Sequence, residues 1–289
     1  MTKSLFWLIF PLFLFACTTA TTVPNTEQAT AIQATISTNT PRPSATSTPT
    51  ITSSPTLITS TPTITPTPTL ISGPAPTLAS INVTLITNGS RELSNVALTF
   101  DVGERPTWLA DFDYEIEDVL NETNTPATFF LGGHWMMRHP EITRRLSANP
   151  LFEIGNHSWA HPDFTTLSQD ELSEEILQAN DIYYQLTGQT MKLFRLPGGT
   201  YNDLALGMIA YHGMLTIQWD VVTGDPVPDN DAENIVRIVM ERVQNGSIIV
   251  MHANGRGWHT AEALPEMIRQ LREAGYELVT VSEVLELEP

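Results

Sequence analysis

The chain of 289 residues carries 14 lysines and arginines against 32 aspartates and glutamates, a formal net charge of −18. Residues 81–289 carry a net charge of −19, because the only charged residues in 1–80 are Lys3, Glu27 and Arg42, with a net charge of +1. So acidic a domain lacks the basic face that nucleic acid requires, which excludes nucleic acid as a partner. The single cysteine excludes a disulfide framework, so the domain must rely on its hydrophobic core.

Residues 1–16, MTKSLFWLIFPLFLFA, place Lys3 before an apolar run. The run has the length of a signal-peptide core and is shorter than the roughly 20 residues needed to span a bilayer. It ends in LFAC, which resembles the lipobox of bacterial lipoproteins. We therefore predict a lipoprotein-type signal peptide, export, and lipidation of Cys17, which anchors the chain to the extracellular face of the cell membrane by acyl chains alone. The alternative is an ordinary signal peptide followed by an incidental cysteine.

Residues 17–80 consist mostly of Thr, Ser, Pro, Ala and Ile, with the near-repeat TPTITPTPT at 61–69. Proline favours an extended backbone, and the segment has little apolar surface to bury. We predict a disordered linker that acts as a passive spacer between the membrane and the folded domain at 81–289.

From residue 94 onward, short apolar runs alternate with amphipathic stretches, which is the pattern of βα units. A helix is expected at 169–186, where Ser168 and Glu171 form a capping box. Two more are expected at 232–244, after Asp231, and at about 266–274, before Gly275. Strands are expected at 96–101, 127–131, 151–154, 191–195, 214–219, 247–251 and, more weakly, 277–281. This alternation predicts an α/β fold, either a barrel or a doubly wound sheet.

Polar residues stand where these strands end. They are Asp101, His157, Arg195, Asp220 and His252. In parallel α/β folds the carboxyl ends of the strands lie on one face, which carries the chemistry. Five such residues therefore predict a functional site.

Three stretches suggest its chemistry. In NHSWAHPDF, His157 and His161 are four residues apart, so on one helical turn both rings could grip a metal, although such pairs also arise by chance. In FRLPGGTYN, Arg195 precedes a turn whose backbone N–H groups can point into a pocket, although a lone arginine is usually a surface ion pair. In IIVMHAN, His252 suits a general acid, although a structural histidine is the simpler interpretation.

Taken together and in this order, TFDVG, NHSWAH, RLPGG and IIVMHAN resemble the polysaccharide deacetylase family, carbohydrate esterase family 4, over about residues 94–286. The resemblance implies a distorted (β/α) barrel of the NodB type. It also implies a hydrolase that removes acetyl groups, most often N-acetyl, from a cell-wall or extracellular polysaccharide such as peptidoglycan or a chitin-like glycan, with a divalent metal, most often zinc.

The resemblance also implies roles for individual residues. Asp101 matches the catalytic base, Arg195 the residue that orients it, and His252 the general acid. His157 and His161 match metal ligands. Around the acetyl group, Gly198 matches the residue whose N–H binds the oxyanion, Val250 matches a pocket wall, and Trp219 stands beside the site.

The sequence departs from the family pattern at two acids. Val102 stands where the family has its third metal ligand, and Val222 stands where the family pattern places an acid that supports the general-acid histidine, while Asp225 matches the pattern. One interpretation retains the enzyme, with Asp101, Glu104 or Asp163 completing the metal site. A second is a catalytically impaired domain that binds polysaccharide, with Trp159, Trp219 and Trp258 stacking on sugar rings. A third is an envelope spacer or adhesion module with a structural metal or none. The retained base, histidines and arginine favour the enzyme.

Overall fold

The computed structural model describes residues 83–287, and the predicted signal peptide, Cys17 and linker lie outside them. The described strands form one nine-stranded parallel sheet in the order β1-β6-β5-β4-β3-β2-β8-β7, with β9 beside β2. The strands are β1 (Leu85–Ile86), β2 (Asn95–Val102), β3 (Ala127–Leu131), β4 (Phe152–Asn156), β5 (Leu193–Phe194), β6 (Leu215–Ile217), β7 (Val221–Val222), β8 (Ile248–His252) and β9 (Glu277–Val279).

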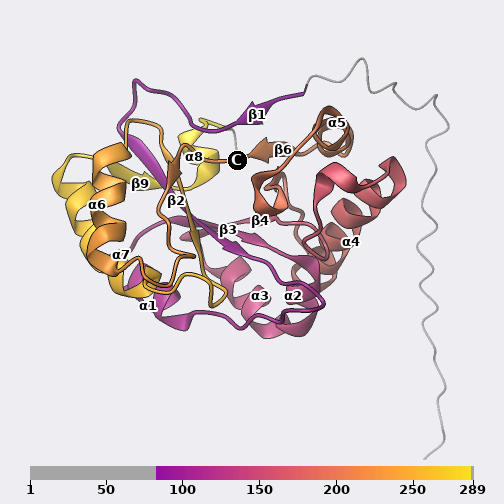
Figure 1. Ribbon diagram of the computed structural model, residues 1–289, viewed down its shortest axis with the longest axis horizontal. Helices are drawn as coiled ribbons and strands as arrows, with labels where there is room; N and C mark the ends of the chain where they lie inside the picture. Colours follow the sequence, from indigo (N-terminus) through magenta and orange to yellow (C-terminus); the bar gives the residue numbers. More distant parts are fainter. Residues whose placement is uncertain (1–82, 288–289) are drawn as a thin grey trace, which may run out of the picture. The chain divides into compact units, whose positions relative to one another are not determined.

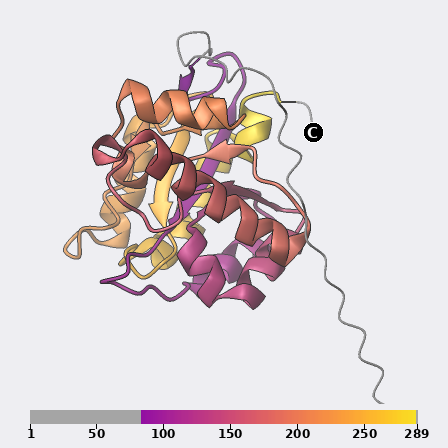
Figure 2. The same cartoon turned by 90° about the vertical axis from the view of Figure 1, so that its right-hand side faces the viewer.

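Helices surround this curled sheet (Figure 1). Figure 2 shows the long helix α4 along its outer side. The helices are α1 (Tyr114–Glu122), α2 (Gly133–Arg138), α3 (Pro140–Ala148), α4 (Gln169–Thr187), α5 (Asp203–Tyr211), α6 (Ala232–Arg242), α7 (Thr260–Glu273) and α8 (Val281–Val284), with short 3-10 turns at Phe164–Thr166 and Pro197–Gly199. In residues 83–287 no helix is both long and apolar enough to cross a membrane. The predicted distorted (β/α) barrel is confirmed.

The alternation along β2 explains how this fold positions a site. Side chains of successive strand residues point to opposite faces. Leu98, Phe100 and Val102 belong to the large core cluster between sheet and helices, whereas Ala97 belongs to a smaller cluster inside the curl. Asp101 follows the two-residue period of Ala97, so it faces the inside of the curl, at the carboxyl end of the strand.

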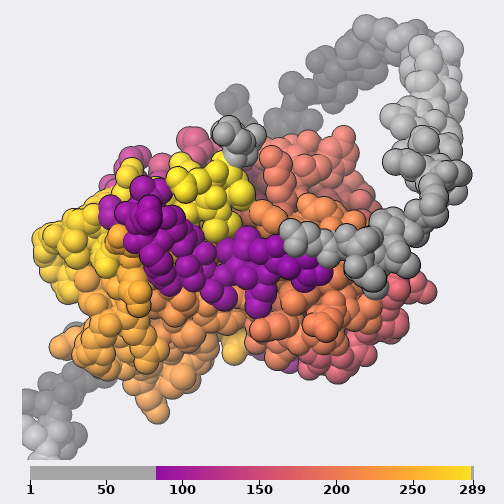
Figure 3. All heavy atoms as spheres, turned by 90° about the horizontal axis from the view of Figure 1, so that it is seen from above, coloured from indigo at the N-terminus to yellow at the C-terminus, as the bar shows by residue number. Residues whose placement is uncertain are grey.

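The opposite end of the curl is closed by local structure. Helix α8 begins with a capping box formed by Thr280 and Glu283, and its Val281 and Val284 belong to the inner cluster. Figure 3 shows the indigo segment with β1 lying across this face beside the yellow C-terminal segment. A Cβ on Gly89 would lie 2.3 Å from the Val284 oxygen, so glycine allows this close approach. Side chains therefore fill one end of the curl, and Asp101 lies toward the other end.

Most predicted elements are confirmed within a few residues. Helix α4 has the expected capping box of Ser168 and Glu171, and Asp231 caps α6. Helix α7 begins at Thr260, earlier than expected, and continues through Pro265, its sixth residue, at the loss of one helical hydrogen bond. The two-residue strands β1 and β7 were missed, since so short a run gives no periodic signal.

Candidate active site

Four of the five predicted polar residues meet at the carboxyl ends of the strands. Asp101 and His252 are register partners on the neighbouring strands β2 and β8, and a pocket is lined by both together with His157. Arg195 bonds to Asp101 from beneath. The expectation for Asp220 was wrong. Its carboxylate accepts the Ile248 N–H at the start of β8, because the unforeseen strand β7 turns the chain after Asp220.

Arg195 holds the Asp101 carboxylate in place. The guanidinium is fully buried, and its Nη1 donates to Asp101 Oδ1 at 3.0 Å and to Thr99 Oγ1 at 2.7 Å. It also lies 4.0 Å from the centroid of the Phe130 ring. Burial by itself raises the pKa of Asp101, but the charge and hydrogen bond of Arg195, together with the charge of His252, outweigh it and hold the pKa below its usual value. Asp101 is therefore ionised, as a general base must be.

Asp225 supports His252. This carboxylate is 1% exposed and accepts the His252 backbone N–H at 2.7 Å, and its Oδ1 lies 3.2 Å from His252 Nδ1. Burial lowers the pKa of His252, but the hydrogen bond and charge of Asp225 outweigh it and raise the pKa. The family pattern places an acid at 222, but Val222 is 45% exposed on β7, and the carboxylate beside His252 is that of Asp225, which follows the strand. The loss of the acid at 222 therefore leaves His252 supported.

The two predicted metal-ligand histidines lie in a loop rather than on a helical turn. Ser158 and His161 adopt positive φ angles of 65° and 56°, which brings the two rings to 4.9 Å between centroids. The Glu175 carboxylate holds the loop by accepting the backbone N–H groups of Trp159 and Ala160. Burial lowers the pKa of His157, and it lowers that of His161 to about 3. Both rings are therefore neutral.

The hydrogen bonds of the two rings do not leave a free nitrogen lone pair on each of them, as a pair of metal ligands would require. His157 Nδ1 donates to the Arg195 carbonyl at 2.9 Å, so its Nε2 keeps a lone pair, and this atom lies 3.8 Å from Asp101 Oδ2. His161 Nδ1 instead accepts the Arg105 Nε–H at 3.4 Å, so the neutral ring carries its proton on Nε2. A fixed guanidinium charge thus lies beside a ring that would have to bind a cation.

No acid is placed to serve as the third metal ligand. Val102 is fully buried in the core cluster that faces the helices. Both oxygens of Glu104 are engaged, one by His134 and the other by Arg138 and the Ala110 N–H. Asp163 accepts hydrogen bonds from Thr165 and Thr200 on the surface, so neither acid takes the expected role. Among residues 83–287 no three His, Cys, Asp or Glu side chains are placed to hold a metal, so the site does not fit the metal that the family resemblance implies.

The predicted acetyl-pocket residues surround the same strand ends. Val250 lies two residues before His252 on β8 and shares its face. Gly198 adopts a φ of 64° in the turn after Arg195, a conformation that glycine permits. A Cβ on the next residue, Gly199, would lie 2.8 Å from the Trp219 ring, so this turn packs against the indole.

The other predicted stacking residues differ in exposure. Trp159 packs against Gly133 and the His134 ring, whereas Trp258 is 60% exposed. Sequence reasoning missed Trp108, which is 40% exposed and lines the pocket together with Arg105 and Arg256. The only signal was a tryptophan and an arginine in the loop after a strand that ends on a candidate base. The enclosed volume is about 20 Å³, enough for one water, so any larger ligand must lie across the mouth.

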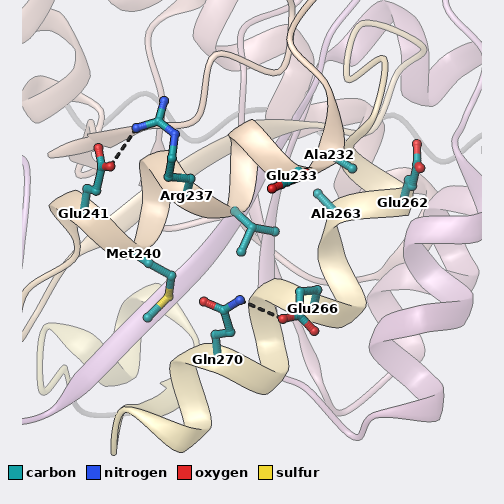
Figure 4. A pocket seen from close by; sticks show the side chains of 10 residues that line it. Ala232, Glu233, Arg237, Met240, Glu241, Glu262, Ala263, Glu266 and Gln270 are labelled. Carbon is teal, nitrogen blue, oxygen red and sulfur yellow. Dashed lines mark hydrogen bonds and ion pairs between the residues drawn. The ribbon is translucent and has the colours of Figure 1, made fainter.

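A larger groove of about 650 Å³ lies between α6 and α7 (Figure 4). Its carboxylates mostly pair with neighbours, as Glu241 does with Arg237 and Glu266 with Gln270. Figure 4 shows these side chains on the two helices, with Met240 on the α6 side of the groove. The groove brings together no base and acid, so the chemistry belongs to the strand ends.

Comparison with known proteins agrees with this geometry. The sequence model of the family named polysaccharide deacetylase matches residues 88–217. A peptidoglycan-N-acetylglucosamine deacetylase of Bacillus cereus is 32% identical over 196 residues, which cover 67% of this chain and 69% of that relative. The chain belongs to the polysaccharide deacetylase family. The predicted family and NodB-type fold are thus confirmed.

Two other relatives of this deacetylase domain bear on whether it is active. The uncharacterized protein YlxY of Bacillus subtilis is 29% identical over 214 residues, and the chain spans 64% of its length. The crystal structure of a CE4 family pseudoenzyme from Bacillus anthracis has a TM-score of 0.64 at 29% identity, over 71% of this chain and 70% of that one. A mutant of such a pseudoenzyme with restored enzymatic activity has a TM-score of 0.63. Proteins with this fold therefore include both active and inactive forms.

Proposed function

We propose that the domain hydrolyses acetyl groups, most often N-acetyl groups, on the polysaccharide of the cell wall. The observation that carries this proposal is the pairing of a base and an acid across one pocket. Asp101 is ionised beside Arg195, and the pKa of His252 is raised beside Asp225. A base that stays ionised beside an acid whose pKa is raised is the pairing that hydrolysis of an amide requires.

The step follows from these two groups. Asp101 takes a proton from water, whose oxygen attacks the carbonyl carbon of the acetyl group. The backbone N–H of Gly198 is suited to stabilise the oxygen that becomes negative, because the turn presents it beside Arg195. His252 then donates its proton to the leaving nitrogen as the carbon–nitrogen bond breaks. The products are acetate and a free amino sugar, and the proton balance between Asp101 and His252 is restored through solvent.

The test is acetate release from peptidoglycan and from N-acetylglucosamine oligomers by the purified protein. Asp101→Asn and His252→Gln should each lower the rate at least a hundredfold. Glu233→Gln, which removes a charge in the groove between α6 and α7, is the matched control and should leave the rate unchanged. No acetate from any acetylated glycan, by a correctly folded wild-type protein, would contradict the proposal.

A second candidate is a polysaccharide-binding domain with impaired catalysis. It is supported by the missing third ligand at Val102, by Arg105 beside His161, and by the similarity to a pseudoenzyme. Acetate release measured beside glycan binding separates the two, because an impaired domain binds the glycan without releasing acetate. Binding that is weakened by Trp258→Ala, with no acetate from any acetylated glycan, would favour the binding domain.

We also propose that the protein is exported and anchored to the outer face of the cell membrane by lipid on Cys17. The support is the Lys3-led apolar run ending in LFAC. Labelling cells with a tritiated fatty acid tests this, because Cys17→Ala should abolish both the label and membrane retention. Retention of the Cys17→Ala protein in the membrane fraction would contradict a lipid anchor.

A further inference from the structure

Two arginines at the mouth of the pocket have no acidic partner. In this acidic domain arginines commonly pair with carboxylates, as Arg138 does with Glu104 and Arg145 with Glu117. Within residues 83–287, Arg105 and Arg256 form no ion pair with a carboxylate, yet both line the pocket. Two such arginines in an acidic protein indicate that their partner is a ligand.

The backbone fixes where both arginines start. Arg105 opens a tight turn in which it exchanges backbone hydrogen bonds of 3.0 and 2.9 Å with Trp108. The Arg256 N–H donates to the Asn254 side chain, whose amide donates to the Gly103 carbonyl at 2.6 Å. Both loops are thereby tied to the end of β2.

Each of these loops also carries an exposed indole. Trp108 closes the turn that Arg105 opens, and Trp258 follows Arg256 by two residues. A flat indole packs well against the apolar face of a sugar ring, while a guanidinium recognises a carboxylate through paired hydrogen bonds. Arg105, Trp108 and Arg256 line the pocket, and Trp258 is exposed on the same loop as Arg256.

The two carboxylates that line the pocket, Asp101 and Glu104, each already have a partner. Asp101 is paired with Arg195, and Glu104 is paired with Arg138. Asp111, Asp113 and Glu115 line a separate hollow against Gly255, and none of them pairs with Arg256. Among the residues that line the pocket, Arg105 and Arg256 therefore carry positive charges that no carboxylate pairs with, and such charges attract an anion.

We propose that Arg105 and Arg256 bind a carboxylate carried by the glycan, so that the site selects an N-acetylated sugar polymer with carboxylate substituents over a neutral one. The inference deepens the proposed function and rests on it, because it assigns the sugar that lies over Asp101 and His252. The inference predicts a difference in glycan binding, not in catalysis, so it applies whether the domain is active or impaired.

The experiment is calorimetric titration of the full-length protein with three probes. The first is a peptide-free peptidoglycan glycan, whose lactyl carboxylates are exposed, and the second is the same glycan with those carboxylates amidated. The third is a neutral N-acetylglucosamine oligomer. Inorganic phosphate is added as a competitor, to separate carboxylate recognition from general anion binding. Arg105→Gln and Arg256→Gln are compared with Arg242→Gln on α6, which removes an equal charge from outside the pocket.

We expect the wild-type protein to bind the first glycan at least tenfold more tightly than the other two. Each glutamine variant should lose about tenfold in affinity for the first glycan only. Arg105→Lys should recover part of this loss, and Arg242→Gln should lose nothing. The inference would be overturned if the wild-type protein bound all three probes equally, or if the glutamine variants lost the same affinity for all three probes. Full competition by phosphate would also overturn it. If acetate is nonetheless released from the neutral oligomer, the proposed function stands and the inference alone fails.

Discussion

Replacing Asp225 by Asn tests whether this residue, and not position 222, supports His252. The change keeps the size of a side chain that is 1% exposed. Its carboxylate accepts the His252 N–H at 2.7 Å and the hydroxyls of Thr260 and Thr223 at 2.9 and 3.0 Å. An amide turns an NH₂ group toward some of these donors, and each buried group left unsatisfied costs about 1–3 kcal/mol. We expect the free energy of unfolding to fall by about 3 kcal/mol.

The variant also changes the proton on His252. Burial lowers the pKa of His252, and Asp225 more than reverses this through a hydrogen bond and its charge. A raised folded-state pKa adds stability that is fully present below the unfolded value, near 6.5, and is lost as the pH rises through the folded pKa. In Asp225→Asn this contribution disappears, and the ring is neutral at neutral pH. Without its acid, acetate release should fall about a hundredfold.

The assay is an NMR titration of the His252 ring in the wild type, Asp225→Asn and the control Val222→Asp. It needs no substrate, and urea unfolding on either side of neutrality gives the stability. The titration should move to lower pH in Asp225→Asn and stay almost unchanged in Val222→Asp, because a carboxylate at that exposed position is screened by water. An unchanged titration in Asp225→Asn would refute the reasoning, and so would an equally large shift in Val222→Asp.

Three further predictions concern other parts of the site and the fold. Val102→Asp buries an acid in the core, so it should lower the free energy of unfolding by about 3–5 kcal/mol without metal. Zinc should restore part of this stability if the new carboxylate joins the histidines. Thermal unfolding with and without zinc measures both effects, and identical unfolding curves would contradict the prediction. Gly103→Ala places a Cβ 2.7 Å from His161 Cδ2 and 2.9 Å from His157 Cδ2, so it should cost about 1–3 kcal/mol and displace both rings, as unfolding and ring chemical shifts would report. Ser168→Ala removes the N-cap of α4 and should cost about 1 kcal/mol in urea unfolding while glycan binding stays intact, and a loss of binding would be unexpected.

Much of the fold follows from local patterns in the sequence. The strand β2 is an apolar run with Asp101 near its end. The N-terminus of α4 can be recognised from the capping box of Ser168 and Glu171. These features depend on residues close together in the chain, whose geometry is fixed by sterics and hydrogen bonding. For the same reason Asp101 and His252 could be placed at the ends of parallel strands and expected to meet.

Other features depended on contacts that no local pattern encodes. Strand β7 is only two residues long, yet it moves Asp220 away from the site and brings Asp225 to His252. The loop of His157 and His161 needs two positive φ angles, which depend on the hydrogen bonds of Glu175 from α4. Such arrangements arise only when distant segments pack, so sequence spacing suggested a helical turn instead.

By itself the sequence determined the alternation of strands and helices, the order of the base, histidine, arginine and acid motifs, and the loss of an acid at position 102. Only the tertiary structure decided which carboxylate supports His252, that Glu104 and Asp163 are committed elsewhere, and that Arg105 lies against His161. The physical reason is that periodicity fixes the face on which a side chain lies, whereas hydrogen bonds and charges act over a few ångströms between residues that are far apart in the chain. Asp101 and Arg195, for example, are 94 positions apart. That proximity exists only after the sheet has curled.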